Sequence, residues 1–354
     1  MFKREYFENL RSYIEILQQS NEPIYIYGMG DGCLKVLKIF KDYNITCSGI
    51  FASDEFVRDK IFEGYKIMRL SEVEAQNESF TAVLAFGAGY QELIEKIDNL
   101  AKKHRLIVPD MPVIGEGLFT KEYLFENFEK IEKVYNALAD ETSKSCFKAV
   151  LEFKITGDIA ILKSCETSPK EAFENILKPE NNEIYLDLGA YTGDTVAEFL
   201  EHTNGSYQKI YAIEPNPRNY RKLTENTEAL QNIVRVHAFA SDYCGKTTVL
   251  KGGGRMIRRA EIGVEIDVVT ADSVLDGERC DYIKYDVEGE ELRALEGTKN
   301  TITNFKPKLN VALYHRVGDI FELPLKVLEM NPDYKLFIRH MPYYTAWDTN
   351  LYAL

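Results

Sequence analysis

A buried apolar strand that runs directly into a glycine turn and a helix constrains this 354-residue chain more than any other feature. The segment 184–195 has the sequence IYLDLGAYTGDT, with Asp187 near the end of the predicted strand. A second apolar segment, 209–213, ends at Glu214. A strand, a glycine turn and a helix, followed by an acid at the end of the next strand, are typical of a nucleotide-binding crevice in an α/β sheet.

The charges around this turn indicate which nucleotide it binds. A dinucleotide places a diphosphate over the helix N-terminus, where free N–H groups and the helix dipole favour an anion. Asp187 and Asp194 flank the turn and would repel a diphosphate. The same carboxylates suit a ligand with an ammonium and a sulfonium group, and Glu214 can accept hydrogen bonds from both ribose hydroxyls. S-adenosylmethionine therefore fits the pattern better than NAD, and the alternative is a turn with a purely structural role.

Composition and charge limit the other classes of function. A chain of this length can form two domains with separate cores, and 45% hydrophobic and 28% charged residues are ordinary for a globular protein. The net charge of −13 argues against a sequence-independent nucleic-acid surface, which needs clustered lysine and arginine. A short basic, glycine-rich run at 251–259 predicts a mobile loop near the site, in a position to meet an anionic substrate.

Location and partners follow from what the sequence does not contain. No apolar run reaches the length of a membrane span, and the first residues predict an amphipathic helix rather than a signal peptide. The six cysteines form no C-x-x-C pair, so neither a zinc site nor a disulfide framework is indicated. We therefore expect a cytoplasmic protein with a small-molecule or saccharide substrate and no membrane or nucleic-acid partner. The sequence does not indicate an oligomeric state.

Strands that alternate with helices predict two parallel α/β units. Residues 1–112 are predicted to form a smaller Rossmann-like domain with a leading helix over 5–19, and residues 113–180 a helical connector. Residues 181–354 are predicted to form a larger α/β domain. Its expected strands are 184–188, 209–213, 233–239, 247–250, 264–269, 281–286, 308–314, 334–340 and 349–354, the last two as an antiparallel hairpin at the sheet edge. Its expected helices are 194–201, 217–229 and 289–303.

Four segments of the larger unit together resemble the FkbM family of S-adenosylmethionine-dependent methyltransferases. They are DLGAYTGDT at 187–195, EPNP at 214–217, IKYDVEG at 283–289 and LYH at 313–315, and they occur in order on the expected elements. The resemblance implies a seven-stranded Rossmann-like methyltransferase sheet whose last strand is antiparallel. It also implies methyl transfer to oxygen, often on sugars or natural products.

The resemblance also implies roles for single residues. Asp187, Gly189, Ala190 and Gly193 would hold the methionine part of S-adenosylmethionine, and Glu214 would bind its ribose. Ser241 and Asp242 would lie near adenine, and Asp319, Arg339 and His340 would contribute to the substrate pocket. The complete set of predicted cofactor-binding residues is Asp187, Gly189, Ala190, Tyr191, Gly193, Asp194, Thr195, Glu214, Asn216, Ser241, Asp242 and Asp286.

His315 is the predicted general base, because an alcohol must lose its proton during methyl transfer and a histidine titrates near neutral pH. It lies at the end of a strand, where ligands bind in open α/β sheets. The alternative is a histidine that only forms a hydrogen bond at a strand end. Lys284 and Asp286 share one strand face and are predicted catalytic residues, with Asp286 orienting either the substrate or His315. Two carboxylates and a histidine can ligate a divalent ion, but no spacing here is diagnostic, so no metal is assigned.

Other functions rest on the first glycine turn, GMGDGC at 28–33. Cys33 stands where a dinucleotide fingerprint has its third glycine, and Asp31 opposes a diphosphate. We therefore expect a structural, substrate-recognising or partner-binding role for this domain, or a vestigial fold. The leading hypothesis for the chain is an O-methyltransferase acting on a saccharide or related metabolite. The alternatives are an NAD(P)-dependent oxidoreductase or epimerase that uses the first domain, and a non-catalytic nucleotide- or sugar-binding scaffold.

Overall fold

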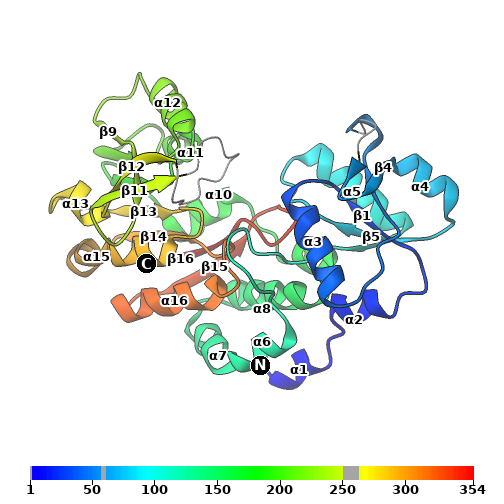
Figure 1. Ribbon diagram of the computed structural model, residues 1–354. Coiled ribbons are helices and arrows are strands. Elements are labelled where there is room, and N and C mark those ends of the chain that lie inside the picture. The colour runs from blue at the N-terminus through cyan, green and yellow to red at the C-terminus, as the bar shows by residue number, and fades with distance from the viewer. Residues whose placement is uncertain (1, 57–60, 250–262) are drawn as a thin grey trace.

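Two α/β regions lie on opposite sides of a helical region in the computed structural model (Figure 1). The structure describes residues 2–56, 61–249 and 263–354. The loop predicted at 251–259 lies outside the described residues.

The N-terminal region is built on a six-stranded sheet in the order β3-β4-β2-β1-β5-β6. Its strands run parallel except for the β3–β4 hairpin. The strands are β1 (Ile24–Tyr27), β2 (Gly49–Ala52), β3 (Ile61–Phe62), β4 (Tyr65–Arg69), β5 (Thr81–Leu84) and β6 (Arg105–Ile107). The helices are α3 (Asp31–Asp42), α4 (Leu70–Gln76), α5 (Gln91–Lys103) and the 3₁₀ turn η1 (Asp54–Phe56). The sequence analysis missed β3, β4 and α4, which lack the continuous apolar run that marks the buried central strands.

The predicted leading helix over 5–19 is wrong as a single element. It consists of α1 (Arg4–Glu8) and α2 (Tyr13–Gln18), because Ser12 starts a new helix. The Ser12 hydroxyl accepts a hydrogen bond from the Glu15 amide, and the Glu15 carboxylate accepts one from the Ser12 amide at 2.7 Å. Such a capping box satisfies amide groups that a continuous helix would bond elsewhere. Helix α1 packs on the helical connector, with the Phe2 ring 4.6 Å from that of Tyr135.

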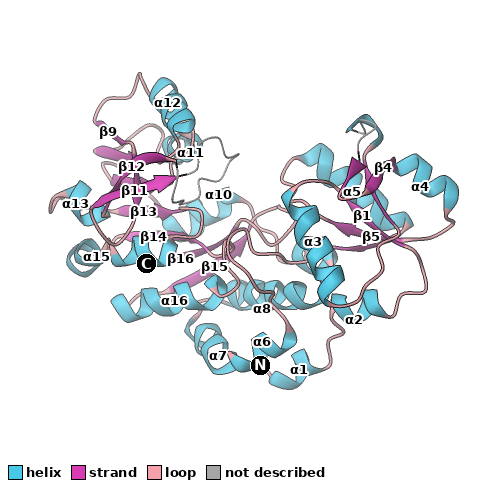
Figure 2. Cartoon of the chain, viewed as in Figure 1, coloured by secondary structure: helices cyan, strands magenta, loops and turns pink. Residues whose placement is uncertain are grey.

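The connector is helical, as predicted (Figure 2). Its helices are α6 (Lys121–Glu126), α7 (Phe128–Ala137), α8 (Glu141–Thr156), α9 (Ile159–Lys163), α10 (Pro169–Glu171) and the π-helical turn η2 (Ala172–Leu177). Of the helices in the described residues, none combines the length and the apolar character needed to cross a membrane.

The C-terminal region contains a seven-stranded sheet in the order β15-β16-β14-β13-β7-β8-β9. Strand β16 runs opposite to the other six strands, so the predicted sheet and its antiparallel last strand are confirmed. The strands are β7 (Ile184–Leu188), β8 (Lys209–Ile213), β9 (Ile233–Val236), β13 (Tyr282–Tyr285), β14 (Lys308–Ala312), β15 (Leu336–His340) and β16 (Thr349–Ala353). The helices are α11 (Asp194–His202), α12 (Pro217–Asn226), α13 (Ala271–Leu275), α14 (Glu291–Glu296), α15 (Lys299–Phe305) and α16 (Asp319–Met330).

Two predicted elements of this region are split. The strand expected over 233–239 divides into β9 and β10 (Ala238–Ala240), and β10 leaves the main sheet for a three-stranded sheet with β12 (Val264–Val269) and β11 (Gly245–Val249). The helix expected over 289–303 divides into α14 and α15 near Gly297. A β-carbon on Gly297 would lie 2.0 Å from the Ser241 carbonyl oxygen, so the break permits a close approach to the end of β10.

The connector covers the edge strand β15, and a buried arginine joins the two. Arg339 is 3% exposed and forms ion pairs with Asp140 at 2.8 Å and Glu171 at 3.0 Å. The same guanidinium donates to the Ser143 hydroxyl at 2.8 Å, and that hydroxyl accepts from the Ile338 amide. The substrate-pocket role that the resemblance implied for Arg339 is therefore corrected to a structural one.

We expect Arg339→Met to lower the free energy of unfolding by about 2–4 kcal/mol, because the substitution strands two partly buried carboxylates without their cation. Urea unfolding measures this change. Arg279→Met is the matched control, since its ion pair with Asp281 is exposed and contributes less than about 0.5 kcal/mol. Equal losses in both variants would contradict a structural role for Arg339.

Candidate active site

The glycine turn after β7 lies directly against the end of β13. Gly189 has a φ of 90°, and a β-carbon at this position would lie 1.9 Å from the Asp286 carbonyl oxygen. Only glycine satisfies both the conformation and the close approach. The turn therefore brings the residues that follow β7 and those that follow β13 to the same edge of the sheet.

A cavity of about 360 Å³ lies at this edge, beside the glycine turn and the end of β8. Seven predicted cofactor-binding residues line it, namely Gly189, Tyr191, Asp194, Thr195, Glu214, Asn216 and Asp286. The sequence analysis missed the other lining residues near β8 and β10, namely Ile213, Pro215, Asn219, Ala238, Phe239 and Ala240. This volume and the mixed polar and apolar lining are typical of a small-molecule site.

Glu214 is the most buried carboxylate of this cavity. It is 5% exposed, and it accepts hydrogen bonds from the Tyr191 amide at 3.0 Å and the Asn216 amide at 2.7 Å. Burial raises its pKa to about 7, although these amides favour its charged form. Glu214 thus ties the glycine turn to the end of β8 while it faces the cavity.

Five predicted cofactor-binding residues do not line this cavity. Asp187 and Ala190 are fully buried and, like Gly193, do not line the cavity; the Asp187 carboxylate accepts a hydrogen bond from the Thr195 hydroxyl. Ser241 is fully buried, and the Asp242 carboxylate binds Arg293 at 2.6 Å. Ala238, Phe239 and Ala240 line the cavity in place of the predicted Ser241 and Asp242, because β10 leaves the main sheet and joins the three-stranded sheet.

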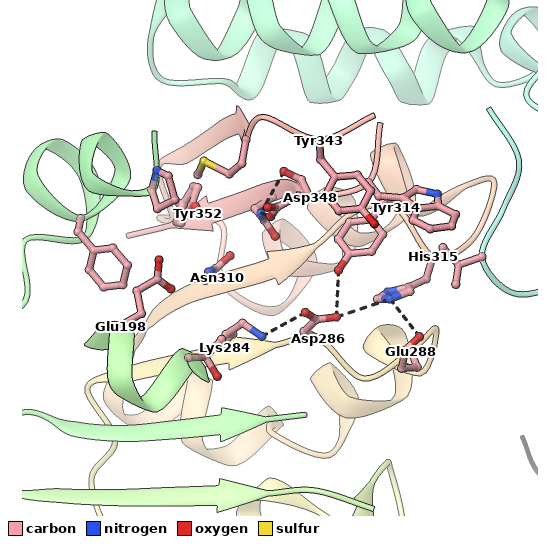
Figure 3. A pocket seen from close by; sticks show the side chains of 17 residues that line it. Glu198, Lys284, Asp286, Glu288, Asn310, Tyr314, His315, Tyr343, Asp348 and Tyr352 are labelled. Atoms are coloured by element: carbon pink, nitrogen blue, oxygen red, sulfur yellow. Dashed lines mark hydrogen bonds and ion pairs between the residues drawn. The ribbon is translucent and has the colours of Figure 1, made fainter. Parts of the chain in front are cut away.

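A second cavity, of about 490 Å³, adjoins the first (Figure 3). The two share residues from four segments of the C-terminal region, namely Thr195, Lys284, Asp286, Glu288, Tyr314 and Tyr343. The remaining residues of the second cavity are Val113, Pro169, Phe173, Glu198, Asn310, His315, Met341, Trp347, Asp348, Asn350 and Tyr352. The predicted catalytic residues Lys284, Asp286 and His315 therefore lie together, two of them at the junction of the cavities.

Lys284 and Asp286 form an ion pair at this junction. Their side chains are 3.2 Å apart, as expected for residues on one strand face, and the Tyr314 hydroxyl donates to Asp286 at 3.2 Å (Figure 3). Burial favours the neutral lysine, but Asp286 and Asp187 outweigh it and raise the pKa of Lys284. Burial likewise opposes the charge of Asp286, but Lys284 and His315 lower the pKa of that carboxyl. Both groups are therefore charged at neutral pH.

His315 is enclosed by carboxylates. It is 2% exposed; its Nδ1 lies 2.9 Å from Glu291, and its Nε2 lies 3.5 Å from Asp286 and 3.7 Å from Glu288. Burial favours the neutral imidazole, but the carboxylates, Glu291 above all, raise its pKa to about 9. The sequence analysis missed Glu291, which lies within the helix expected over 289–303 and is 1% exposed.

This charge state does not suit the general-base role predicted for His315. Each ring nitrogen faces a carboxylate, so the ring carries both protons at neutral pH and has no free lone pair to accept another. Glu288 suits that role better. It lines both cavities, and burial raises its pKa. Its backbone is in the left-handed region, with a φ of 53°, as is seen for residues held in place at functional sites.

Asp286, Glu291 and His315 could also hold a metal ion, because each offers a ligand atom within 4.8 Å of the others. Two features disfavour this use. The Lys284 ammonium lies 3.2 Å from Asp286 and would repel a cation. The His315 proton already balances Glu291, and a metal would have to displace it.

Aromatic rings pack against the glycine turn of the N-terminal region. A β-carbon on Gly28 would lie 2.4 Å from the Phe86 ring, which packs edge-on against Tyr27 at 5.0 Å. A β-carbon on Gly32 would lie 1.9 Å from the Ala85 carbonyl oxygen. These glycines therefore allow close packing of helix α3 and the end of β5. The geometry does not favour the diphosphate site that an NAD(P)-dependent enzyme would need here.

The same N-terminal region supports the second cavity. The segment between β15 and β16, residues 341–348, reaches across to it, shown in red in Figure 1. The Tyr344 amide donates to the Ala88 carbonyl at 2.8 Å. A β-carbon on Gly87 would lie 2.7 Å from Trp347, and one on Gly89 would lie 2.7 Å from Tyr343. Residues of both α/β regions therefore fix the aromatic wall of the cavity.

We expect Glu291→Gln to lower the pKa of His315 from about 9 toward its ordinary value of 6.5, because the substitution removes the main source of stabilisation of the imidazolium. NMR titration of the histidine ring protons measures this pKa, with His315→Gln used for assignment. Glu296→Gln is the matched control on the same helix, since Glu296 pairs with Lys326 instead. A His315 pKa that stays near 9 in Glu291→Gln would contradict the assignment.

The chain was compared with family models and with solved structures, and both comparisons point to methyltransferases. Residues 187–342 match the family model of the methyltransferase FkbM domain. The crystal structure of methyltransferase FkbM from Methylobacillus flagellatus KT is similar over 96% of this chain and 92% of its own, with a TM-score of 0.70 and 21% sequence identity. This similarity extends the fold comparison to the N-terminal region and the connector.

Weaker similarities cover about half of this chain. Aeropyrum pernix fibrillarin with bound S-adenosyl-L-methionine matches 49% of this chain and 67% of its own, with a TM-score of 0.33 and 14% identity. Precorrin-6y C5,15-methyltransferase from Geobacter metallireducens matches 50% and 82%, with a TM-score of 0.31 and 12% identity. These values are too low to support an inference. No sequence match was found among curated proteins.

Proposed function

We propose that the protein transfers a methyl group from S-adenosylmethionine to a hydroxyl group of a saccharide or related small metabolite. The premise is the match of residues 187–342 to the methyltransferase FkbM domain, the family that the sequence motifs resemble. The observation that carries the proposal is the meeting of two cavities at Lys284, Asp286 and Glu288. A group-transfer reaction between two small molecules needs such adjoining sites, because the reacting atoms must come into contact in line.

The residues of the smaller cavity fit S-adenosylmethionine. Asp194, Glu214, Asp286 and Glu288 give it an excess of carboxylates over the single ammonium of Lys284. This balance favours a cationic ligand and opposes a diphosphate. Glu214 would accept hydrogen bonds from the ribose, and Asp194 would attract the amino group. When bound, S-adenosylmethionine supplies an electrophilic methyl group on a sulfonium.

The larger cavity would hold the acceptor. Its volume of about 490 Å³ suits a small molecule, and its wall combines aromatic rings with carboxylate and amide groups. Glu288 would act as the general base and remove the proton of the acceptor hydroxyl, because burial raises the pKa of its carboxyl and it lines both cavities. The His315 imidazolium lies 3.7 Å from Glu288 and stabilises its ionised form before the proton arrives. Lys284 and Tyr314 hold Asp286 in place beside them.

We expect S-adenosylhomocysteine, the demethylated product, to bind the wild-type protein in isothermal titration calorimetry and to raise its melting temperature. Glu214→Gln should bind about tenfold more weakly, because one carboxylate acceptor is lost. Glu225→Gln is the control, since Glu225 lies exposed on α12. A wild-type protein that shows no binding at about 1 mM ligand would contradict the proposed cofactor.

His315 lines only the larger cavity, so we expect His315→Gln to abolish turnover and leave S-adenosylhomocysteine binding unchanged. Turnover is measured as methyl-labelled product by mass spectrometry after incubation with a mixture of saccharides. The wild-type rate should rise with pH as Glu288 ionises and fall as His315 loses its proton near pH 9. A rate that instead keeps rising through pH 9 would restore His315 as the base.

We also propose that the protein acts in the cytoplasm. Its cysteines, all within the described residues, are free thiols in the structure, which suits a reducing compartment. Fractionation of cells that express the native chain would test this location.

A further inference from the structure

We propose that the acceptor carries a protonated amine, which is bound in the larger cavity by Glu198 and Asp348. This inference rests on the proposed function in one respect, because it takes the larger cavity to be the acceptor site. It goes further by assigning a charge and a functional group to a substrate that the methyltransferase fold leaves open.

Glu198 is an ionisable group that the proposed chemistry does not use. It lies on α11, one turn after Thr195, and its side chain lines the larger cavity (Figure 3). It makes no hydrogen bond or ion pair with any residue in the described part of the chain. Burial raises its pKa to about 7; Lys284 opposes this shift and Asp348 adds to it. A half-buried carboxylate with no partner is costly unless a ligand supplies one.

Two neighbouring polar groups also lack partners. Tyr352 is 3% exposed and lines the cavity, and its hydroxyl has no hydrogen-bond partner among the described residues. The Asn310 side-chain oxygen is buried and accepts no hydrogen bond from the described residues. Figure 3 shows Glu198, Asn310, Asp348 and Tyr352 in the part of the cavity away from His315. Most of these groups are hydrogen-bond acceptors, so the missing partner is a donor.

The charges of the cavity favour a cationic donor. Asp286 pairs with Lys284, and Glu288 faces His315. Asp348 accepts a hydrogen bond from the neutral Asn350 amide at 2.8 Å, so neither it nor Glu198 has an ion-pair partner among the described residues. Burial also raises the pKa of Asp348, as expected for a carboxylate without a counter-charge.

An ammonium group supplies the donors and the counter-charge that these side chains lack. It offers three N–H donors and a positive charge, and it can lie against the aromatic rings of Phe173 and Tyr352, which face the same cavity. A neutral polyol can supply donors, but it leaves both carboxylates without a counter-charge. A carboxylate or phosphate on the acceptor would be repelled.

The chain provides its own reporter for a binding experiment. Trp347 is its single tryptophan, and it lines the larger cavity. Titration of the intact protein with glucosamine and with glucose at pH 7, followed by tryptophan fluorescence, compares two ligands that differ by an amine in place of one hydroxyl. We expect glucosamine to bind at least about tenfold more tightly than glucose, as for hydrogen bonds to a charged group.

Matched variants test whether Glu198 and Asp348 cause the preference. Glu198→Gln and Asp348→Asn should each reduce it about tenfold, and Glu201→Gln, an exposed position on the same helix, should leave it unchanged. Unchanged melting temperatures show that the variants are folded. Equal binding of the two sugars, no response to glucosamine at about 50 mM, or a preference that survives both variants would overturn the inference.

These measurements distinguish a failure of the proposed methyl donor from a failure of the proposed amine. S-adenosylhomocysteine binds the smaller cavity, which neither Glu198 nor Asp348 lines. Loss of that binding with an intact preference for glucosamine would refute the methyl donor alone. Intact binding without the preference would refute the amine alone.

Discussion

The ammonium of Lys284 lies between two carboxylates, and the geometry of the site depends on this arrangement. Lys284 on β13 is directly opposite Asp187 on β7 in the parallel register, and it forms an ion pair with Asp286 two residues later. Asp187 is fully buried, and one of its oxygens has no hydrogen-bond partner in the described residues. Buried charges of this kind persist only when they compensate one another. Burial raises the pKa of Asp187 and the Lys284 ammonium opposes that shift, while the same ammonium helps to lower the pKa of Asp286 at the junction of the cavities.

Three carboxylates surround His315, and the surroundings of Asp286 and Glu288 give those two different pKa values. Glu291, which is almost completely buried, fixes one ring nitrogen, while Asp286 and Glu288 face the other. Because both nitrogens carry protons, the ring acts as a local positive charge. The unequal surroundings lower the pKa of Asp286 and raise that of Glu288, so neighbouring acids can serve different functions.

The N-terminal region contributes to the site without using its own crevice. Phe86 packs against the glycine turn of this region and against Tyr27, whereas the loop after β5 packs against Tyr343 and Trp347 through Gly87 and Gly89. The connector holds β15, the edge strand that precedes Tyr343 and Trp347 in the chain, through Arg339. A Rossmann-like fold can thus act as a wall for a neighbouring active site.

The local pattern of residues was enough to predict the cofactor edge of the site. The apolar strand at 184–188, the glycines that follow it and the acid after the next strand predict elements whose ends must meet in a parallel sheet. Seven of the predicted cofactor-binding residues line the smaller cavity for that reason. Ser241 and Asp242 do not, because the expected strand divides at Ala238 and its second half joins another sheet. The alternation of apolar and polar residues along a strand does not show that its second half pairs with a different sheet.

The sequence by itself determined the strand–helix alternation around the cofactor edge, its glycine turn and its acidic character, because these depend on neighbours along the chain. Only the tertiary structure decided the acceptor cavity and the charge of His315. Glu198, Glu291 and Asp348 come from segments far apart in the sequence, and nothing in their local pattern separates them from surface acids. Their burial and their distances to other charges arise when the sheet closes, and those two quantities set their protonation and their function.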